Sequence, residues 1–242
     1  MSKTIDYKEL AVRYGLDPIP DSVIRLTQLL SKQDADLEEI ARVISADPDL
    51  TVRLLRVANP RATNDQEFTI ETVEEALMRT GVGCVLLLAM GAPLTAAILK
   101  TFQTMAGIQV RSVHPRSLPP LRGEHICGSI GFSGKAEGMI ELRMIRPVAQ
   151  RVAAAVLGLP EKELTDPTAV ADTIGELLNI VTGNFKSNLC DAGLDCRIQP
   201  PKVHYANEVT PPPASAGGVE RMAFRGPNVE LFVTMVVNPW AD

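Results

Sequence analysis

The sequence contains no recognisable metal-ligand motif. No two of its four cysteines form a Cys-x-x-Cys pair; they are Cys84, Cys127, Cys190 and Cys196. The three histidines, His114, His125 and His204, are not spaced from these cysteines as zinc ligands would be. No disulfide framework or metal site is therefore indicated, and we expect reduced thiols that are buried or half-buried. No histidine neighbours a candidate nucleophile, so all three are interpreted as ordinary surface or loop residues.

The sequence also lacks the features of nucleic-acid and membrane proteins. Its 24 basic and 29 acidic residues give a net charge of −5, and no run of Lys or Arg could release counterions from a phosphate backbone. The polar beginning, MSKTIDYKELAVRYG, contains no secretory hydrophobic region. The longest apolar run, Cys84 to Leu99, is shorter than the ~18–20 residues of a membrane span and contains Gly91 and Pro93. We expect a cytoplasmic protein with no nucleic-acid or membrane partner.

The first part of the chain has a helical pattern. At 242 residues the chain is long enough for two modest domains, and nearly everything from Asp21 to Leu99 has helical periodicity. One helix is predicted in PIPDSVIRLTQLLSK and a second after a cap at Asp36. A third follows the turn at Asp47-Pro48-Asp49, and its side chains Leu50, Val52, Leu54, Leu55 and Val57 are expected to pack. A fourth begins with a capping box at Thr72 and Glu75 and continues to Met90. These helices predict a small all-α bundle.

Two segments of this bundle resemble a known family. ISADPDLTVRLLRVAN followed by TIETVEEALMRTGV resembles the opening half of an HDOD domain, a helical signalling module related to the metal-dependent HD phosphohydrolases. The resemblance covers about Pro18 to Met90 and lacks the later helices of the family, so residues 1–90 are predicted to be a truncated HDOD-like domain. No His-Asp dyad occurs in it, which leaves a binding or dimerisation role.

After Met90 the pattern mixes helices and strands. A helix ending at Gly107 leads into a short strand, and SVHPRSLPPLRGEH is interpreted as a proline-rich linker or loop. Two strands are predicted in HICGSIGFSG and AEGMIELRMI, and a helix in RPVAQRVAAAVLGL. A final hairpin is predicted from VERMAFRG and NVELFVTMVVN, with its turn at Gly226-Pro227-Asn228. The irregular alternation predicts an α+β fold, with an all-α bundle over 1–90 and an α+β domain over 91–242.

The helix around ADTIGELLNIVTGNFKSNL has an apolar stripe and a polar face. At about 100° per residue the stripe contains Val170, Ile174, Leu177, Leu178, Val181, Phe185 and Asn188, and the far side contains Asp172, Glu176, Asn179, Gly183 and Lys186. Glu176 and Asn179 are three residues apart and so are neighbours. Gly183 costs roughly 1 kcal/mol of helix stability relative to Ala, but it leaves a flat place beside Asn179. On spacing alone, this pair is more typical of a solvated surface than of a site.

The surroundings of this helix resemble a second family. The segment DTIGELLNIVTGNFKSNL, preceded by GSIGFSGKAEGMIELRMIRPVAQRVAAAVLG and followed by DCRIQPPKVH, is similar to the CheX-type chemotaxis phosphatases of the CheC/CheX/FliY group. The likeness runs from about Pro93 to Asn238 and implies a CheX-like domain with an antiparallel sheet and two long helices. In that group a Glu-x-x-Asn pair on a long helix is the phosphatase motif. Only one such unit occurs here, so the single-site, dimeric CheX type is the closer model, and a homodimer is among the expectations.

The resemblance implies a phosphatase for the aspartyl phosphate of a CheY-like receiver domain, in chemotaxis or another two-component pathway. Hydrolysis by in-line attack of water depends mainly on positioning, so Asn179 is assigned to hold the water and Glu176 to pair with a lysine of the receiver. Asp172, Gly183 and Lys186 are the predicted partner contacts. The Mg²⁺ would belong to the receiver, so no cofactor of the chain itself is expected.

Two other functions stay open. A non-catalytic signalling module that binds a receiver is favoured by the truncated HDOD-like region, and it would lose little without Asn179. Nucleotide or cyclic-dinucleotide binding would need a Gly-rich phosphate loop opening a helix or an arginine cluster, but GSIGFSGKAEG lies between two strands and predicts a hairpin turn. A long Pro/Ala/Gly-rich loop follows IQPPKVHYANEV, and if it folds back over the Ala171 helix it would mask the site.

Overall fold

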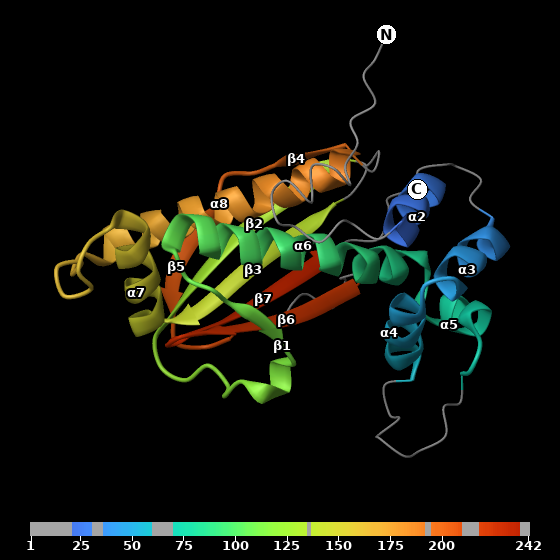
Figure 1. Ribbon diagram of the computed structural model, residues 1–242, viewed down its shortest axis with the longest axis horizontal. Helices are drawn as coiled ribbons and strands as arrows, with labels where there is room; N and C mark the ends of the chain where they lie inside the picture. The colour runs from blue at the N-terminus through green and yellow to red at the C-terminus, as the bar shows by residue number, and fades with distance from the viewer. Residues whose placement is uncertain are drawn as a thin grey trace, which may run out of the picture.

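The fold is α+β, as the sequence predicts. The computed structural model describes residues 21–30, 36–59, 70–134, 137–191, 195–209 and 218–237. A group of short helices lies at one end of the molecule, and the remainder is a single antiparallel sheet on which the longer helices pack (Figure 1).

The short helices begin where the sequence supplies capping side chains. They are α2 (Asp21–Leu30), α3 (Leu37–Ser45), α4 (Pro48–Ala58) and α5 (Val73–Thr80). The Asp36 carboxylate accepts a hydrogen bond from the backbone N–H of Glu38 at 3.0 Å, and Asp47 accepts one from Leu50 at 3.0 Å. The Thr72 hydroxyl accepts one from the N–H of Glu75 at 3.2 Å. The predicted starts of α3, α4 and α5 are therefore confirmed.

The predicted packing of α4 is wrong at two positions. Leu50 and Leu54 are buried, whereas Val52 and Val57 are 46% and 45% exposed. Residues four apart share one face of a helix, and Val52 is turned about 200° from Leu50. Only the face with Leu50 and Leu54 therefore reaches the core.

The predicted helix from Val73 to Met90 is interrupted at Gly81. Gly81 has φ of +77°, a conformation that other residues adopt only with strain, and its N–H bonds the carbonyl of Leu77 at 2.8 Å. The next helix, α6 (Val82–Ala106), continues through both Gly91 and Pro93. A proline inside a helix costs about 3 kcal/mol. Buried side chains on both sides of Pro93, such as Leu88 and Leu94, contribute about 1.5–3 kcal/mol each and outweigh that cost.

Helix α6 joins the two parts of the chain. It contacts α2, α4 and α5 at one end, and β6, β7, α7 and α8 further along. The predicted boundary between residues 90 and 91 lies inside this helix, and the division into 1–90 and 91–242 stays a prediction. No helix in the described ranges combines the length and hydropathy that crossing a membrane requires.

Within the described residues, the sheet has seven strands. They are β1 (Arg111–Val113), β2 (His125–Gly134), β3 (Gly138–Ile145), β4 (Cys196–Ile198), β5 (Lys202–Ala206), β6 (Gly218–Gly226) and β7 (Val229–Val237). Their order is β1-β6-β7-β3-β2-β4, and β5 also pairs with β2. All pairs are antiparallel, including the predicted hairpins of β2 with β3 and of β6 with β7. The proline-rich segment is therefore a connection within one sheet, with a short 3-10 helix η1 (Pro115–Ser117).

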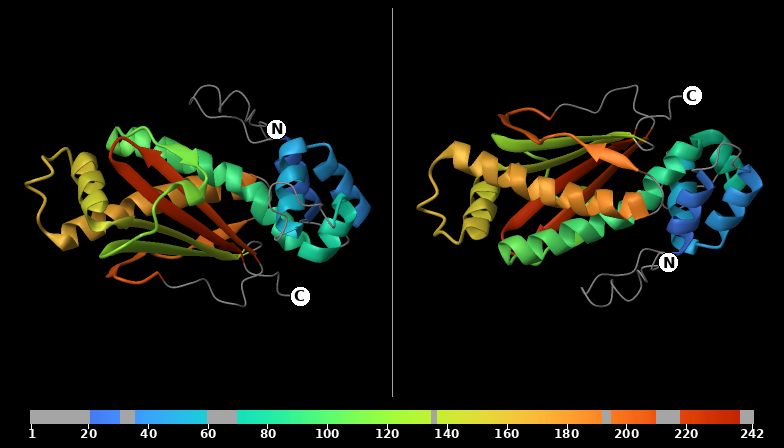
Figure 2. Two further views of the ribbon diagram at one scale, coloured as in Figure 1. Left: turned by 90° about the horizontal axis from the view of Figure 1, so that it is seen from below. Right: turned by 90° about the horizontal axis from the view of Figure 1, so that it is seen from above.

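Two further helices complete the layer on the sheet. Helix α7 (Arg146–Leu157) begins with Pro147 in its first turn and ends before Gly158, which has φ of +66°. Helix α8 (Pro167–Asp191) lies beside α6, and together the two long helices cover the sheet (Figure 2). Their apolar faces and the facing strand residues form one continuous core with the short helices.

Candidate functional site

The apolar stripe predicted on α8 is its buried face. Six side chains of that stripe are at most 4% exposed: Val170, Ile174, Leu177, Leu178, Val181 and Phe185. The side chain of Asn188, the seventh predicted member, lies outside the described residues. The opposite side of α8 is consequently the side that a partner can reach.

Two glycines bring the buried face of α8 close to the sheet. A Cβ on Gly128 of β2 would lie 3.1 Å from the Leu178 side chain, and a Cβ on Gly175 of α8 would lie 3.3 Å from that of Val203. Side chains at these positions would push the helix outward. The close approach fixes the position of α8 on β2 and β5.

Hydrogen bonds hold the flank and the start of α8. The Asn184 amide donates to the Thr101 hydroxyl of α6 at 3.4 Å, and the Tyr205 hydroxyl of β5 donates to the carbonyl of Pro167 at 3.1 Å. The backbone N–H of Thr168 donates to the Asp166 carboxylate at 2.9 Å, which caps the first turn. These contacts make α8 a fixed platform for the residues on its outer face.

Glu176 and Asn179 lie on this outer face. Glu176 is exposed and Asn179 is half-buried. Within the described ranges, neither side chain has a hydrogen-bond or ion-pair partner. Because residues three apart on a helix are neighbours, the carboxylate and the amide can contact a single partner together. The structure therefore presents both groups on one accessible face.

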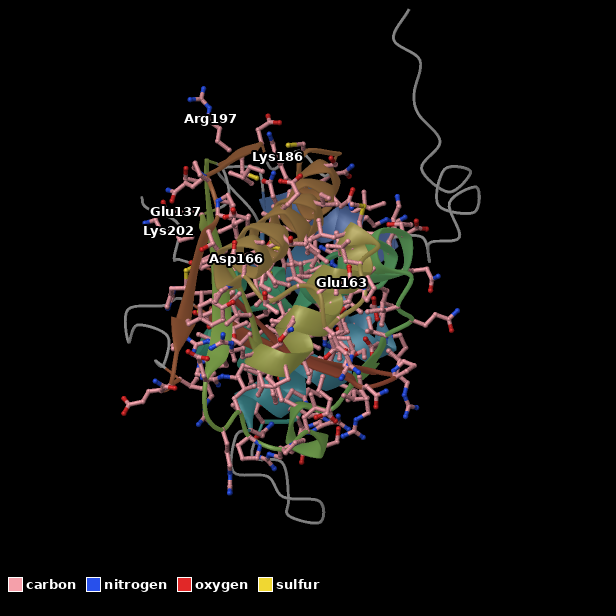
Figure 3. The ribbon with its side chains drawn as sticks, turned by 90° about the vertical axis from the view of Figure 1, so that its left-hand side faces the viewer. Glu137, Glu163, Asp166, Lys186, Arg197 and Lys202 are labelled. Atoms are coloured by element: carbon pink, nitrogen blue, oxygen red, sulfur yellow. The ribbon has the colours of Figure 1, made fainter. Side chains whose placement is uncertain are left out.

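The predicted partner contacts extend this face along the helix. Asp172 is exposed, Gly183 and Lys186 are half-exposed, and a Cβ on Gly183 would meet no atom within 4 Å. Figure 3 shows Lys186 on the upper side of the molecule, where Arg197 of β4 also lies. We call the residues Asp172, Glu176, Asn179, Gly183 and Lys186 the outer face of α8.

Three buried thiols, those of Cys84, Cys127 and Cys196, are poor candidates for chemistry. Burial raises the pKa of the Cys127 thiol to about 12, to which the Glu141 carboxylate also contributes. Burial likewise raises the pKa of Cys196 to about 11 and raises that of Cys84. Protonated thiols are weak nucleophiles at neutral pH. Over the described residues, no three His, Cys, Asp or Glu side chains gather as a possible metal site.

Some features of the site had no local signal in the sequence. Gly128, Gly175 and Asn184 position α8 through contacts with distant segments, and only the folded chain brings these together. The loop expected to mask the helix includes residues 210–217, which lie outside the described residues. Masking by that loop stays a prediction.

Two family models match the chain. Residues 126–220 match the model described as chemotaxis phosphatase CheX, and residues 16–118 match the model described as HDOD domain. The CheX match includes all of α8. The HDOD match continues beyond the Met90 limit of the sequence resemblance through the rest of α6, β1 and η1. The predicted resemblance to both families is confirmed for these segments. None of the curated proteins matches the chain.

Solved structures resemble the C-terminal part. The chemotaxis protein CheX from Vibrio vulnificus is 24% identical, with a TM-score of 0.53 over 62% of this chain and 96% of that one. A chemotactic CheC-like protein from Shewanella oneidensis MR-1 is 21% identical, with a TM-score of 0.51 over 60% and 95%. The CheX–CheY–BeF3–Mg²⁺ complex from Borrelia burgdorferi contains a chain 22% identical, with a TM-score of 0.50 over 61% and 96%. The C-terminal part therefore has a CheX-like fold.

Proposed function

We propose that this protein is a cytoplasmic phosphatase that hydrolyses the aspartyl phosphate of a CheY-like response regulator, in chemotaxis or another two-component pathway. The CheX family match includes Glu176 and Asn179, and one of the similar structures is a complex of CheX with CheY. The observation that carries the proposal is the Glu-x-x-Asn pair, an exposed Glu176 and a half-buried Asn179, both without partners in the described structure. The opposite face of the same helix is packed in the core.

Asn179 is proposed to place the attacking water. Phosphoryl transfer needs the water and the leaving oxygen in line, and the catalyst contributes mainly by positioning and by charge stabilisation. An amide has both donor and acceptor atoms, so it can orient a water without acting as a base. The packing of α8 against β2 and α6 holds the backbone of Asn179 in place during this step.

Glu176 is proposed to fix the docking of the receiver. Its exposed carboxylate is available for a charge-assisted hydrogen bond with a lysine of the partner. Asp172 and Lys186, at either end of the outer face of α8, would add contacts of opposite charge and so favour one orientation.

Gly183 is proposed to let the receiver approach closely. A Cβ there would meet no atom of the described structure within 4 Å, so the described packing gives no reason for a glycine. The helix accepts a cost of about 1 kcal/mol relative to Ala at this position. The open surface beside Asn179 is the compensating gain.

The metal ion of the reaction is proposed to come with the substrate. A Mg²⁺ held by the phosphorylated receiver would neutralise phosphoryl charge, and the residues of this chain would supply position and docking. The homodimer that the resemblance implies stays a prediction.

The decay of receiver aspartyl phosphate tests the proposal. Several receivers are phosphorylated, and the loss of phosphate is followed with the wild-type chain and with Asn179→Ala, while binding is measured separately. We expect faster loss for at least one receiver, and a decrease of about a hundredfold in that acceleration for Asn179→Ala with binding retained. Receivers that bind but keep unchanged phosphate lifetimes would instead identify a non-catalytic interaction module.

A further inference from the structure

A groove of about 1590 Å³ lies on the other side of α6 from α8. Its walls are α4, α6, β1 with η1, and β6, and we call it the junction groove. Helix α4 belongs to the N-terminal helices, whereas β6 belongs to the sheet. The similar solved structures cover the C-terminal part of the chain, so the α4 wall is an addition to their fold.

The junction groove is strongly cationic in an acidic protein. Among the described residues, seven Lys and Arg side chains and two acidic ones, Asp49 and Glu220, line it, which gives a net of +5. The whole chain has a net charge of −5. Such a concentration of one sign in a concave surface attracts ligands of the opposite sign.

Four of the groove arginines have no side-chain partner in the described structure. Arg56, Arg111, Arg116 and Arg221 are exposed, and the described part of the chain gives their side chains no hydrogen-bond or ion-pair partner. They come from α4, β1, η1 and β6, so they surround the groove and do not share one surface. Guanidinium groups in this arrangement can bind carboxylates along an extended ligand.

Other cations of the groove already have partners. Arg53 pairs with Glu220, and Arg225 donates to Glu230 at 2.9 Å and to the carbonyl of Ser117 at 2.9 Å. These contacts brace the walls against one another. The four arginines without partners therefore project from walls that are already held together, which lowers the conformational-entropy cost of binding a ligand.

The apolar side chains in the floor of the groove indicate which kind of anionic ligand it suits. Its lining includes Val57, which is 45% exposed, and the apolar side chains of Leu88, Leu99, Val110 and Met222. Among the residues that the structure describes, no Phe, Tyr or Trp lines the groove. Proteins that bind single-stranded nucleic acid use aromatic side chains as stacking platforms, and the described lining contains none. Apolar side chains flanked by arginines suit a peptide that contains both acidic and apolar residues.

The sheet edge adds a third element. Within the described structure, β1 pairs with β6 and with no second strand, so it is an edge strand there. The groove lining runs from Gln109 through β1 to Arg116. The free edge of a strand offers backbone hydrogen bonds to an added extended chain. A peptide can use this edge in a way that a nucleic acid cannot.

We propose that the junction groove binds an acidic peptide segment with interspersed apolar side chains, supplied by a partner protein. The arginines bind its carboxylates, and Val57 with its neighbours contacts its apolar side chains. Because α6 separates this groove from the outer face of α8, the peptide can be bound while a receiver occupies α8. The N-terminal helices would in this way give the chain a second, independent partner site.

Fluorescence anisotropy of a short fluorescein-labelled peptide of alternating Glu and Leu tests the proposal on the full chain. The groove variants are Arg56→Glu with Arg116→Glu, and Arg221→Glu alone. The matched control is Arg79→Glu with Arg122→Glu, two exposed arginines that do not line the groove. We expect the wild type and the control to bind alike, the double groove variant to bind at least about tenfold more weakly, and added salt to weaken binding.

Three further probes make the proposal falsifiable: a Lys/Leu peptide, a polyglutamate peptide and single-stranded oligo-dT. Absence of binding by the Glu/Leu peptide would overturn it, and so would equal losses in the groove and control variants. Equal or tighter binding of the Lys/Leu peptide would contradict a cationic groove, and tighter oligo-dT binding would identify a nucleic-acid site. If polyglutamate binds as tightly as the Glu/Leu peptide, the apolar floor does not contribute to binding, and that part of the proposal is wrong. Thermal unfolding of each variant confirms that a lost signal does not reflect a lost fold.

Discussion

The two long helices, α6 and α8, have equal lengths of 25 residues but very different surfaces. Helix α6 has a single charged side chain, Lys100, and contacts the helices α2, α4, α5, α7 and α8 and the strands β6 and β7. Helix α8 has a buried apolar stripe and an opposite face with Asp172, Glu176 and Lys186. A helix that is apolar all round is a core element, whereas one with a polar face is available to a partner. In this molecule α6 joins the parts and α8 performs the proposed chemistry.

The glycines inside these helices show the same difference. A Cβ on Gly91 of α6 would lie 2.5 Å from the Glu220 carboxylate, so the glycine makes room for a side chain of the protein itself. A Cβ on Gly183 of α8 would meet nothing within 4 Å. The fold explains the first glycine, whereas our explanation of the second is the proposed approach of a receiver.

The largest effect is expected at the ion pair beside α6. Glu220 of β6 pairs with Arg53 of α4, with only 16% and 27% of their side chains exposed, and its Oε2 has no hydrogen-bond partner in the described structure. Burial raises the pKa of Glu220 from 4.5 to about 7, and Arg53 limits the rise. A raised carboxyl pKa stabilises the fold below pH 4.5, and this contribution is lost as the pH rises to 7.

Glu220→Gln should therefore remove a pH dependence of the unfolding free energy of about 3 kcal/mol between pH 4.5 and 8. Denaturant unfolding across this range measures it. The control is Glu230→Gln, which removes a carboxylate from an exposed pair with Arg225. If the wild type and Glu220→Gln have parallel pH profiles, Glu220 is not a buried carboxyl of raised pKa.

Gly91→Ala should destabilise the fold by about 1 kcal/mol. The added methyl group displaces the Glu220 carboxylate from Arg53, and this loss exceeds the gain in helix propensity. In a Glu220→Ala background the same substitution should instead stabilise the fold, because only the propensity gain of up to about 1 kcal/mol remains. Equal effects in both backgrounds, measured by urea unfolding, would show that Gly91 and Glu220 are not coupled.

Gly183→Ala should have the opposite effect on stability. With open space around the new methyl group, the variant should be more stable by up to about 1 kcal/mol. The same methyl group should slow the proposed dephosphorylation, because it stands beside Asn179 where the receiver approaches. Unfolding and phosphate-decay measurements on one preparation separate the two effects. A variant that is more stable and fully active would leave Gly183 without a functional role.

Local features of the fold were predictable because the residues that cause them are close in sequence. Asp36, Asp47 and Thr72 cap the helices that follow them, and the stripe from Val170 to Phe185 has helical spacing. The polar face with Glu176 and Asn179 follows from that same spacing. Its function came from resemblance to a family, since spacing alone does not separate a site from a solvated surface.

Features that depend on distant contacts were not predictable. The helix break at Gly81 and the passage of α6 through Pro93 are decided by packing, which outweighs local propensity. Arg53 and Glu220 are 167 residues apart, so no local pattern indicates their pairing or the groove beside them. The arginines of that groove are scattered over four elements, and none of them belongs to a run of basic residues.

The most direct test of the different roles of the two faces of α8 uses its two asparagines. Asn179 lies on the outer face without a partner in the described structure, and Asn184 donates to Thr101 of α6. The measurement is the acceleration of receiver phosphate loss by Asn179→Ala and by Asn184→Ala at saturating concentrations. We predict a loss of about a hundredfold for Asn179→Ala at unchanged stability, and near wild-type activity for Asn184→Ala. Equal activity of the two variants would contradict the assignment of the phosphatase site to the outer face of α8.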